Sequence, residues 1–125
     1  MALENLLPLS ATEWRLMFCV WELRAATPPQ VAEHLRTQLG EKVSPKTAGI
    51  FLARLEEKGY LRSAPGPSQA VRGRPPHVYS PLVSREDALR RQLQKFLDDH
   101  LIEEKDISLL EAFLAQSREQ VKVPG

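Results

Sequence analysis

Residues 44–61 read SPKTAGIFLARLEEKGYL, and this stretch decides the predicted fold. Ser44 followed by Pro45 is typical of a helix start, because serine caps free N–H groups and proline fits the first helical turn. Apolar residues then recur at helical spacing, and Gly59 is expected to end the helix. The predicted inner face comprises Ala48, Phe51, Leu52 and Leu55. Other sides of the helix carry Lys46, Thr47, Ile50 and Arg54.

Two further helices are predicted before this stretch. Ser10, with Glu13 three residues later, forms a capping box. The apolar face predicted for the first helix comprises Trp14, Met17, Phe18 and Trp21, widened by Leu16, Val20 and Leu23. The second helix is expected to run from Thr27 to about Leu39, with Gly40 as its stop. Its predicted inner residues are Val31, Ala32 and Leu35.

After Gly59 the pattern changes to two short extended segments, residues 60–62 and 77–79. They are joined by SAPGPSQAVRGRPP, a stretch without acidic residues that contains Arg72 and Arg74. We therefore expect a β-hairpin with a long basic loop.

Two amphipathic helices are predicted beyond the hairpin, one opening at Ser84 and the other near Asp106. Their apolar stripe is too large to leave in water, so we expect it to form a dimer interface or a core within the tail. These residues are Leu89, Leu93, Phe96, Leu97, Ile107, Leu110, Phe113 and Leu114. The order of elements predicts a mainly α fold with a small β-hairpin. We expect a winged helix-turn-helix domain over residues 1–81 and a helical dimerisation region over residues 82–125.

A net charge of +1 over 125 residues argues at first sight against nucleic-acid binding. The charge is unevenly distributed, however. Residues 1–81 hold ten Lys/Arg and seven acidic residues (+3), whereas residues 82–125 hold seven and nine (−2). Within residues 44–81 there are six basic and two acidic residues. Positive charge is thus concentrated in the third helix and the loop, the two elements that would touch DNA in this fold.

The residue types that usually catalyse reactions or bind metals do not indicate an enzyme or a metalloprotein. Cys19 is the single cysteine, which excludes an internal disulfide and any cysteine-cluster metal site, and its apolar flanks predict a buried, inert thiol. His34, His77 and His100 lack ligand-like spacing, so no metal or other cofactor is expected. No Ser/His/Asp, Cys/His or phosphate-loop arrangement is visible, and no catalytic residue is assigned. No membrane span or signal peptide is expected either, and the expected location is the cytoplasm.

Three segments carry a resemblance to the penicillinase repressor (BlaI/MecI) family: LSATEWRLMFCVWEL at residues 9–23, the stretch at residues 44–61, and VYSPLVSRED at residues 78–87. The resemblance implies a homodimeric winged-helix repressor that binds a palindromic operator in double-stranded DNA and dimerises through its C-terminal helices. It places Ser44, Lys46 and Thr47 at the DNA. It also matches Arg54 to an arginine of the family.

The chain departs from the family pattern at three points. Where members commonly have a polar pair, it has Gly49 and Ile50. It lacks the C-terminal cysteine cluster of the copper-responsive branch, so that form of sensing is not expected. The family's Asn-Phe cleavage point corresponds by spacing to Lys95 and Phe96, and the missing asparagine argues against the family's route of induction. A sensor or protease partner therefore stays unassigned.

The residues themselves suggest how DNA would be bound. A helix N-terminus suits phosphate, and Lys46 can reach a guanine edge in the major groove. Arg72 and Arg74 can enter the minor groove or bind phosphate. The candidate DNA-binding residues are Ser44, Lys46, Thr47, Arg54, Arg62, Arg72 and Arg74.

Two alternatives stay open at this point. Arg54 can instead pair with Glu57 or Glu33, and the whole chain can be a winged-helix protein-interaction module without specific DNA binding. That module would use the apolar tail and the proline-rich loop on a protein partner. The aromatic residues Trp14, Trp21 and Phe51 are assigned to the core and not to base stacking.

Overall fold

The computed structural model describes residues 8–66 and 77–120, with only the backbone described for residues 119 and 120. In chain order the elements are α1 (Ala11–Leu23), α2 (Pro28–Leu39), α3 (Pro45–Glu57), β1 (Leu61–Pro65), β2 (His77–Pro81), α4 (Arg85–Asp99) and α5 (Glu104–Gln120). The chain divides into two compact units, Met1–Gln92 and Leu93–Gly125, and α4 runs across the division.

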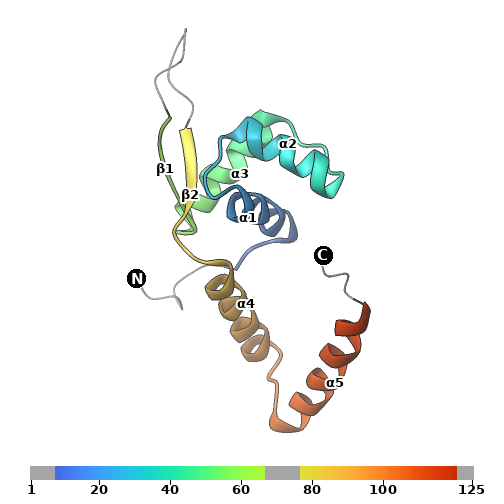
Figure 1. Cartoon of the computed structure of the whole chain (residues 1–125). Helices are drawn as coiled ribbons and strands as arrows, with labels where there is room; N and C mark the ends of the chain where they lie inside the picture. Colours follow the sequence, from blue (N-terminus) through green and yellow to red (C-terminus); the bar gives the residue numbers. More distant parts are fainter. Residues whose placement is uncertain (1–7, 67–76, 121–125) are drawn as a thin grey trace. The chain divides into compact units, whose positions relative to one another are not determined.

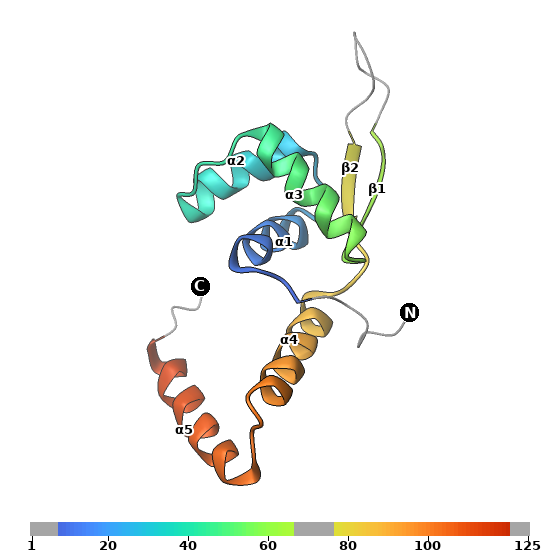
Figure 2. The same ribbon diagram turned by 180° about the vertical axis from the view of Figure 1, so that it is seen from behind.

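The first unit is a helix cluster with a hairpin. α1, α2 and α3 pack against one another, and β1 and β2 run antiparallel beside α3 (Figures 1 and 2). Leu61 pairs with Pro81 at one end of the hairpin and Pro65 with His77 at the other. Ala26, between α1 and α2, exchanges two backbone hydrogen bonds with Tyr79 of β2, at 3.0 and 2.8 Å. This arrangement confirms the predicted mainly α winged-helix fold.

The predicted starts of the first two helices are confirmed in atomic detail. The Glu13 N–H donates to Ser10 Oγ (3.2 Å), and the Ser10 N–H donates to Glu13 Oε1 (2.8 Å). Thr27 and Gln30 form the equivalent pair at the start of α2. Gly40 ends α2 with φ +64°, a left-handed conformation that glycine adopts without strain.

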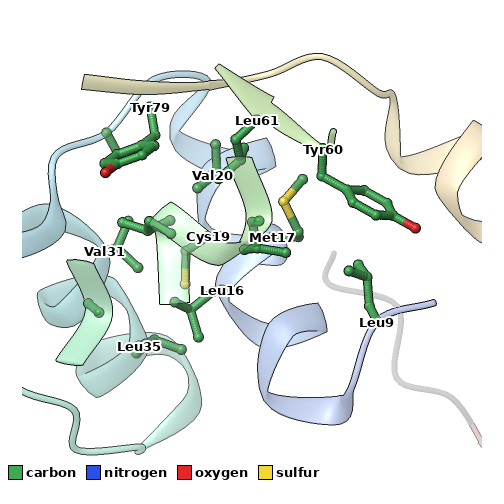
Figure 3. Packing of buried hydrophobic residues seen from close by; sticks show 14 of the residues in the cluster. Leu9, Leu16, Met17, Cys19, Val20, Val31, Leu35, Tyr60, Leu61 and Tyr79 are labelled. Carbon is green, nitrogen blue, oxygen red and sulfur yellow. The ribbon is translucent and has the colours of Figure 1, made fainter. Parts of the chain in front are cut away.

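The core differs in part from the predicted apolar face of α1. Leu16, Met17, Cys19 and Val20 are fully buried and meet residues from α2 and the hairpin (Figure 3). By contrast, Trp14, Phe18 and Trp21 are only partly buried at the edge of the core, and Leu23 is exposed. The reason is that α1 contacts α2, α3 and β2. A helix enclosed on several sides buries more than one stripe.

The predicted inner residues of α2 and α3 are buried, with one exception. Val31, Ala32, Leu35, Ala48, Leu52 and Leu55 all belong to the core. Phe51 is only partly buried and packs against the core from outside it. The predicted outward placement of Lys46, Thr47, Ile50 and Arg54 is confirmed, because all four are exposed.

Some element ends differ from the prediction. α3 ends at Glu57, and both strands extend to five residues. α5 begins at Glu104, earlier than expected, because the Asp106 carboxylate accepts the Glu103 N–H at 3.0 Å. Asp106 is thus the acidic residue inside the first turn and not the cap itself.

α4 starts inside the first unit. Ser84 caps it by accepting the Asp87 N–H at 3.0 Å, as predicted. Val83 and Ala88 are buried in the core, and Val83 also accepts a hydrogen bond from the Trp21 indole at 2.9 Å. The first compact unit therefore includes the beginning of α4, beyond the functional boundary predicted after residue 81. The assignment of separate functions to the two parts stays a prediction.

Candidate nucleic-acid interface

The first turn of α3 is exposed and free of acidic side chains. Ser44 caps it: the Thr47 N–H donates to Ser44 Oγ at 3.1 Å, and the Ser44 hydroxyl donates to Thr47 Oγ1 at 3.0 Å. Pro45 occupies the first helical position, and the side chain of Lys46 is exposed. The partial positive charge of a helix N-terminus and the ammonium group of Lys46 therefore occur in one turn, a combination suited to an anion such as DNA phosphate.

The exposed face of α3 continues from this turn through Ile50 and Ala53 to Arg54. The guanidinium carbon of Arg54 lies 5.4 Å from the centroid of the Phe51 ring. A cation over an aromatic face is attracted to it, which restricts the side chain without neutralising its charge. The alternative pairing with Glu33 is not favoured, because Glu33 is hydrogen-bonded to Arg36.

Gly49 lies on a different side of α3 from Ile50. A methyl group added at Gly49 would lie 3.6 Å from Cγ of Pro28, at the start of α2. Gly49 therefore faces the neighbouring helix and not the exposed surface. Of Gly49 and Ile50, which replace the polar pair of the family pattern, Ile50 is the one available to a ligand.

Arg62 lies on β1, the strand that adjoins α3. Arg62 is exposed on β1, where it pairs with Ser80, whereas the preceding Leu61 is buried. Glu56, near the end of α3, accepts hydrogen bonds from the Ser63 N–H (3.2 Å) and hydroxyl (2.8 Å). These bonds attach β1 to α3, and they leave the Glu56 carboxylate hydrogen-bonded to the strand.

Of the seven predicted DNA-binding residues, the structure places Ser44, Lys46 and Thr47 in a single helical turn, with Arg54 further along the same helix and Arg62 on the adjoining strand. Arg72 and Arg74 lie outside the described residues.

Two basic residues beside α3 were not singled out from the sequence. A hollow of about 370 Å³ borders the start of α3, and its lining includes Arg36, Lys42 and Ser44. Hydrogen bonding between Arg36 and Glu33 lowers the pKa of Glu33 and raises that of Arg36, so both stay charged. Lys42 is exposed two residues before the helix cap. The closeness of Lys42 to the helix cap in the sequence could have identified it as a candidate DNA-binding residue.

The histidines lie on separate elements, as predicted. His34 Nε2 is 2.7 Å from Glu22 Oε1, and the His100 ring stacks on Phe96 with centroids 4.3 Å apart. His77 begins β2. Within residues 8–66 and 77–120, no three His, Cys, Asp or Glu side chains are grouped so that they could hold a metal ion.

Cys19 is a buried thiol, in agreement with the prediction. Burial, together with the negative charges of Glu22 and Glu41, raises its pKa to about 11. The reactive thiolate is therefore scarce at neutral pH.

The apolar residues predicted for dimerisation are not taken up by a core of the described chain. The exposed members are Leu89, Leu93, Phe96, Ile107, Phe113 and Leu114, while Leu97 and Leu110 are partly exposed. Six large apolar side chains on these two helices are therefore exposed, and apolar surface of this kind, where it is contiguous, marks an interaction site.

A family model described as penicillinase repressor matches residues 9–122. The chain belongs to this family. The family comprises DNA-binding transcriptional repressors and not enzymes, as the resemblance in the sequence implied.

Solved structures share the fold of this penicillinase repressor family member. A complex structure of hsRosR-S1 is 17% identical with a TM-score of 0.53, covering 91% of this chain and 96% of that one. A structure of H. salinarum RosR, described as grown from NaBr, is 18% identical with a TM-score of 0.51, and the match covers 90% of this chain and 96% of that one. Monomeric Bacillus licheniformis BlaI, in complex with the blaP half-operator, is 24% identical with a TM-score of 0.50, covering 66% and 89%.

Comparison with curated protein sequences gave no match. Among the helices of the described ranges, none has the length and apolar character that a bilayer-spanning helix requires.

Proposed function

We propose that this repressor acts as a homodimer on a palindromic operator in double-stranded DNA. Each protomer inserts α3 into a major groove and places its hairpin on the flanking backbone. The proposed contacts are Ser44, Lys46, Thr47, Arg54 and Arg62, with Arg72 and Arg74 from the loop between the strands. Because DNA is its ligand, we expect the protein to act in the cytoplasm.

The observation that carries this proposal is the exposed first turn of α3, where a capped helix N-terminus and Lys46 present positive charge together. The Glu33 carboxylate nearby is paired with Arg36, which reduces repulsion of phosphate. The family relative bound as a monomer to a half-operator supports one winged domain per half-site.

The exposed apolar residues of α4 and α5 support dimerisation. Burying them against a second copy removes apolar surface from water, which is the main driving force for association. A two-fold symmetric dimer binds two half-sites related by the same symmetry, about one helical turn (~10 bp) or a multiple apart. A palindromic operator follows from that symmetry.

Salt dependence of DNA binding tests the proposal. We would select bound duplexes from a random DNA pool with the full chain and measure their dissociation constants at several salt concentrations. Several phosphate contacts predict a loss of affinity by orders of magnitude between roughly 50 and 200 mM salt. Lys46→Ala is expected to weaken DNA binding. If Lys46 contacts phosphate, the substitution should also reduce the slope of log binding constant against log salt concentration by about one.

Lys105→Ala is the matched control, because Lys105 is an exposed lysine on α5, distant in sequence from α3. It should leave the affinity unchanged. A chain that binds no DNA at low salt, but forms a stable complex with a different protein, would instead be a winged-helix interaction module.

A further inference from the structure

Ile50 lies in the middle of the exposed face of α3. Its side chain is 49% exposed and is not among the apolar residues that pack on the core. Lys46 and Thr47 lie one turn before it, and Ala53 and Arg54 one turn after it, all exposed. Residues three and four apart share a helix face, so Ile50 is flanked along this face by a cation on either side.

Exposure of one apolar residue is common on protein surfaces and carries no argument alone. The position of Ile50 is what matters. The neighbouring Gly49 faces Pro28, so Ile50 alone of this pair reaches the exposed face. Pro45 to Leu55 contains no carboxylate, and the Glu56 carboxylate that follows is hydrogen-bonded to Ser63. The centre of this face is therefore apolar, with Lys46 one turn before it and Arg54 one turn after it, and the exposed carboxylate of Glu57 follows only three residues beyond Arg54.

The chemistry of the major groove determines what such a face can recognise. Base edges there present hydrogen-bond donors, acceptors and one apolar group, the C5-methyl of thymine. Isoleucine has no donor or acceptor to offer, and it would desolvate polar base edges without replacing their hydrogen bonds. An apolar side chain between Lys46 and Arg54 thus fits a methyl group.

We propose that Ile50 is a specificity-determining residue that contacts the C5-methyl group of a thymine in each half-site. This inference rests on the proposed function, in which α3 enters the major groove. The same methyl group occurs on 5-methylcytosine. Thymine is the proposed contact, and the experiment distinguishes it from 5-methylcytosine.

The test uses the full chain and the duplex obtained by selection from a random pool. Each thymine of one half-site is replaced singly by uracil, which removes the methyl group and preserves base pairing. When uracil replaces the contacted thymine, the wild-type protein should bind the duplex about fourfold more weakly, because the transfer free energy of one methyl group is lost. Ile50→Ala should bind the thymine and uracil duplexes equally.

Leu82→Ala is the matched control. Leu82 is 50% exposed, almost the same as Ile50, but it follows β2 and lies outside α3. This variant should retain the wild-type preference for thymine over uracil. Thermal unfolding of both variants checks that the fold is intact, as expected for substitutions of exposed side chains.

A second arm replaces the contacted thymine–adenine pair by cytosine–guanine, with and without a C5-methyl group on the cytosine. Tighter wild-type binding to the methylated form, absent in Ile50→Ala, would identify the methyl group itself as the feature recognised. If wild type instead prefers only 5-methylcytosine and ignores thymine-to-uracil replacement, the thymine assignment is overturned.

Other outcomes are equally decisive. Specific DNA binding with no effect of uracil and no preference for 5-methylcytosine would overturn the role of Ile50 while leaving the proposed function standing. An unchanged uracil effect in Ile50→Ala would assign the methyl contact to another residue. Failure to bind any duplex would overturn the proposed function and this inference together.

Discussion

The Nζ atom of Lys58, immediately after α3, lies 2.7 Å from Oε1 of Glu13 in α1. Lys58 also donates to the carbonyl oxygen of Pro8 at 3.2 Å. The same Glu13 carboxylate closes the capping box with Ser10. One buried carboxylate therefore completes the start of α1 and holds the C-terminal end of α3. This contact helps to position the helix proposed to read DNA.

Loss of the Lys58 ammonium group should destabilise the first unit. Lys58→Met leaves the buried Glu13 carboxylate without its cation, and a hydrogen bond to a charged group contributes about 2 kcal/mol. Thermal or urea unfolding should show a loss of about this size. Lys105→Met removes an exposed lysine and should change stability by less than about 0.5 kcal/mol. Equal stability of the two variants would contradict a stabilising role for the Glu13–Lys58 pair.

Glu13 should also make stability depend on pH in the acid range. Burial alone raises its pKa, but the hydrogen bonds from Lys58 and Ser10 outweigh burial, and the pKa is lowered from 4.5. Because the folded-state pKa is the lower one, the stabilisation is complete above about pH 4.5 and is lost as pH falls through the folded value. As pH is lowered from 7 to 3, the free energy of unfolding should decrease more steeply for wild type than for Glu13→Gln. Parallel curves would show that Glu13 does not supply this dependence.

Replacement of two glycines by alanine should change the stability of the fold in opposite directions. At Gly49 an added methyl group meets only Pro28 at ordinary contact distances, so Gly49→Ala should stabilise α3 by up to about 1 kcal/mol. At Gly40 the space is free, but φ is +64°, so Gly40→Ala should destabilise by about 1 kcal/mol. Thermal unfolding measures both. Destabilisation by Gly49→Ala would mean that α2 and α3 approach more closely than described.

Cys19 should be inert in the folded protein. Its burial and its pKa of about 11 predict negligible reaction with a disulfide thiol reagent near pH 8, at which a free cysteine reacts readily. Addition of denaturant should release one reactive thiol per chain. Rapid labelling without denaturant would show that α1 opens on the time scale of the reaction.

A charge on the apolar face of α5 should separate the proposed dimer. Phe113 is 62% exposed, so Phe113→Glu should be tolerated by the fold while it places a carboxylate in the apolar interface. Sedimentation should show a shift from dimer to monomer, with operator affinity falling accordingly. Leu82→Glu places the same charge on an exposed leucine outside α4 and α5 and should leave the dimer intact. A monomeric wild type would contradict the proposed assembly.

Local sequence signals predicted the helices well because their causes are local. Ser10 with Glu13, and Thr27 with Gln30, cap helices through bonds only three residues apart. Gly40 ends α2 because its backbone conformation suits glycine. The outward placement of Lys46 and Thr47 follows from the 3.6-residue repeat. The family resemblance then pointed to the same turn as the DNA-binding surface.

Contacts between distant parts of the chain could not be predicted in the same way. The pairing of Glu13 with Lys58, and the hydrogen bonds from Ser63 to Glu56, depend on how α1, α3 and β1 pack. The burial of Cys19 deeper than Trp14 depends on α1 being enclosed by α2, α3 and β2.

The sequence by itself therefore determined the order and type of the elements, the winged-helix class and the exposed basic residues of α3, because capping, periodicity and charge are properties of neighbouring residues. The outward position of Ile50 was predicted from the helical repeat, whereas the tertiary structure alone decided that Gly49 faces Pro28 of α2. Gly49 and Ile50 are adjacent in sequence, yet α2 covers the first and leaves the second exposed. The covering of Gly49 arises from the packing of one helix on another, which no local pattern encodes.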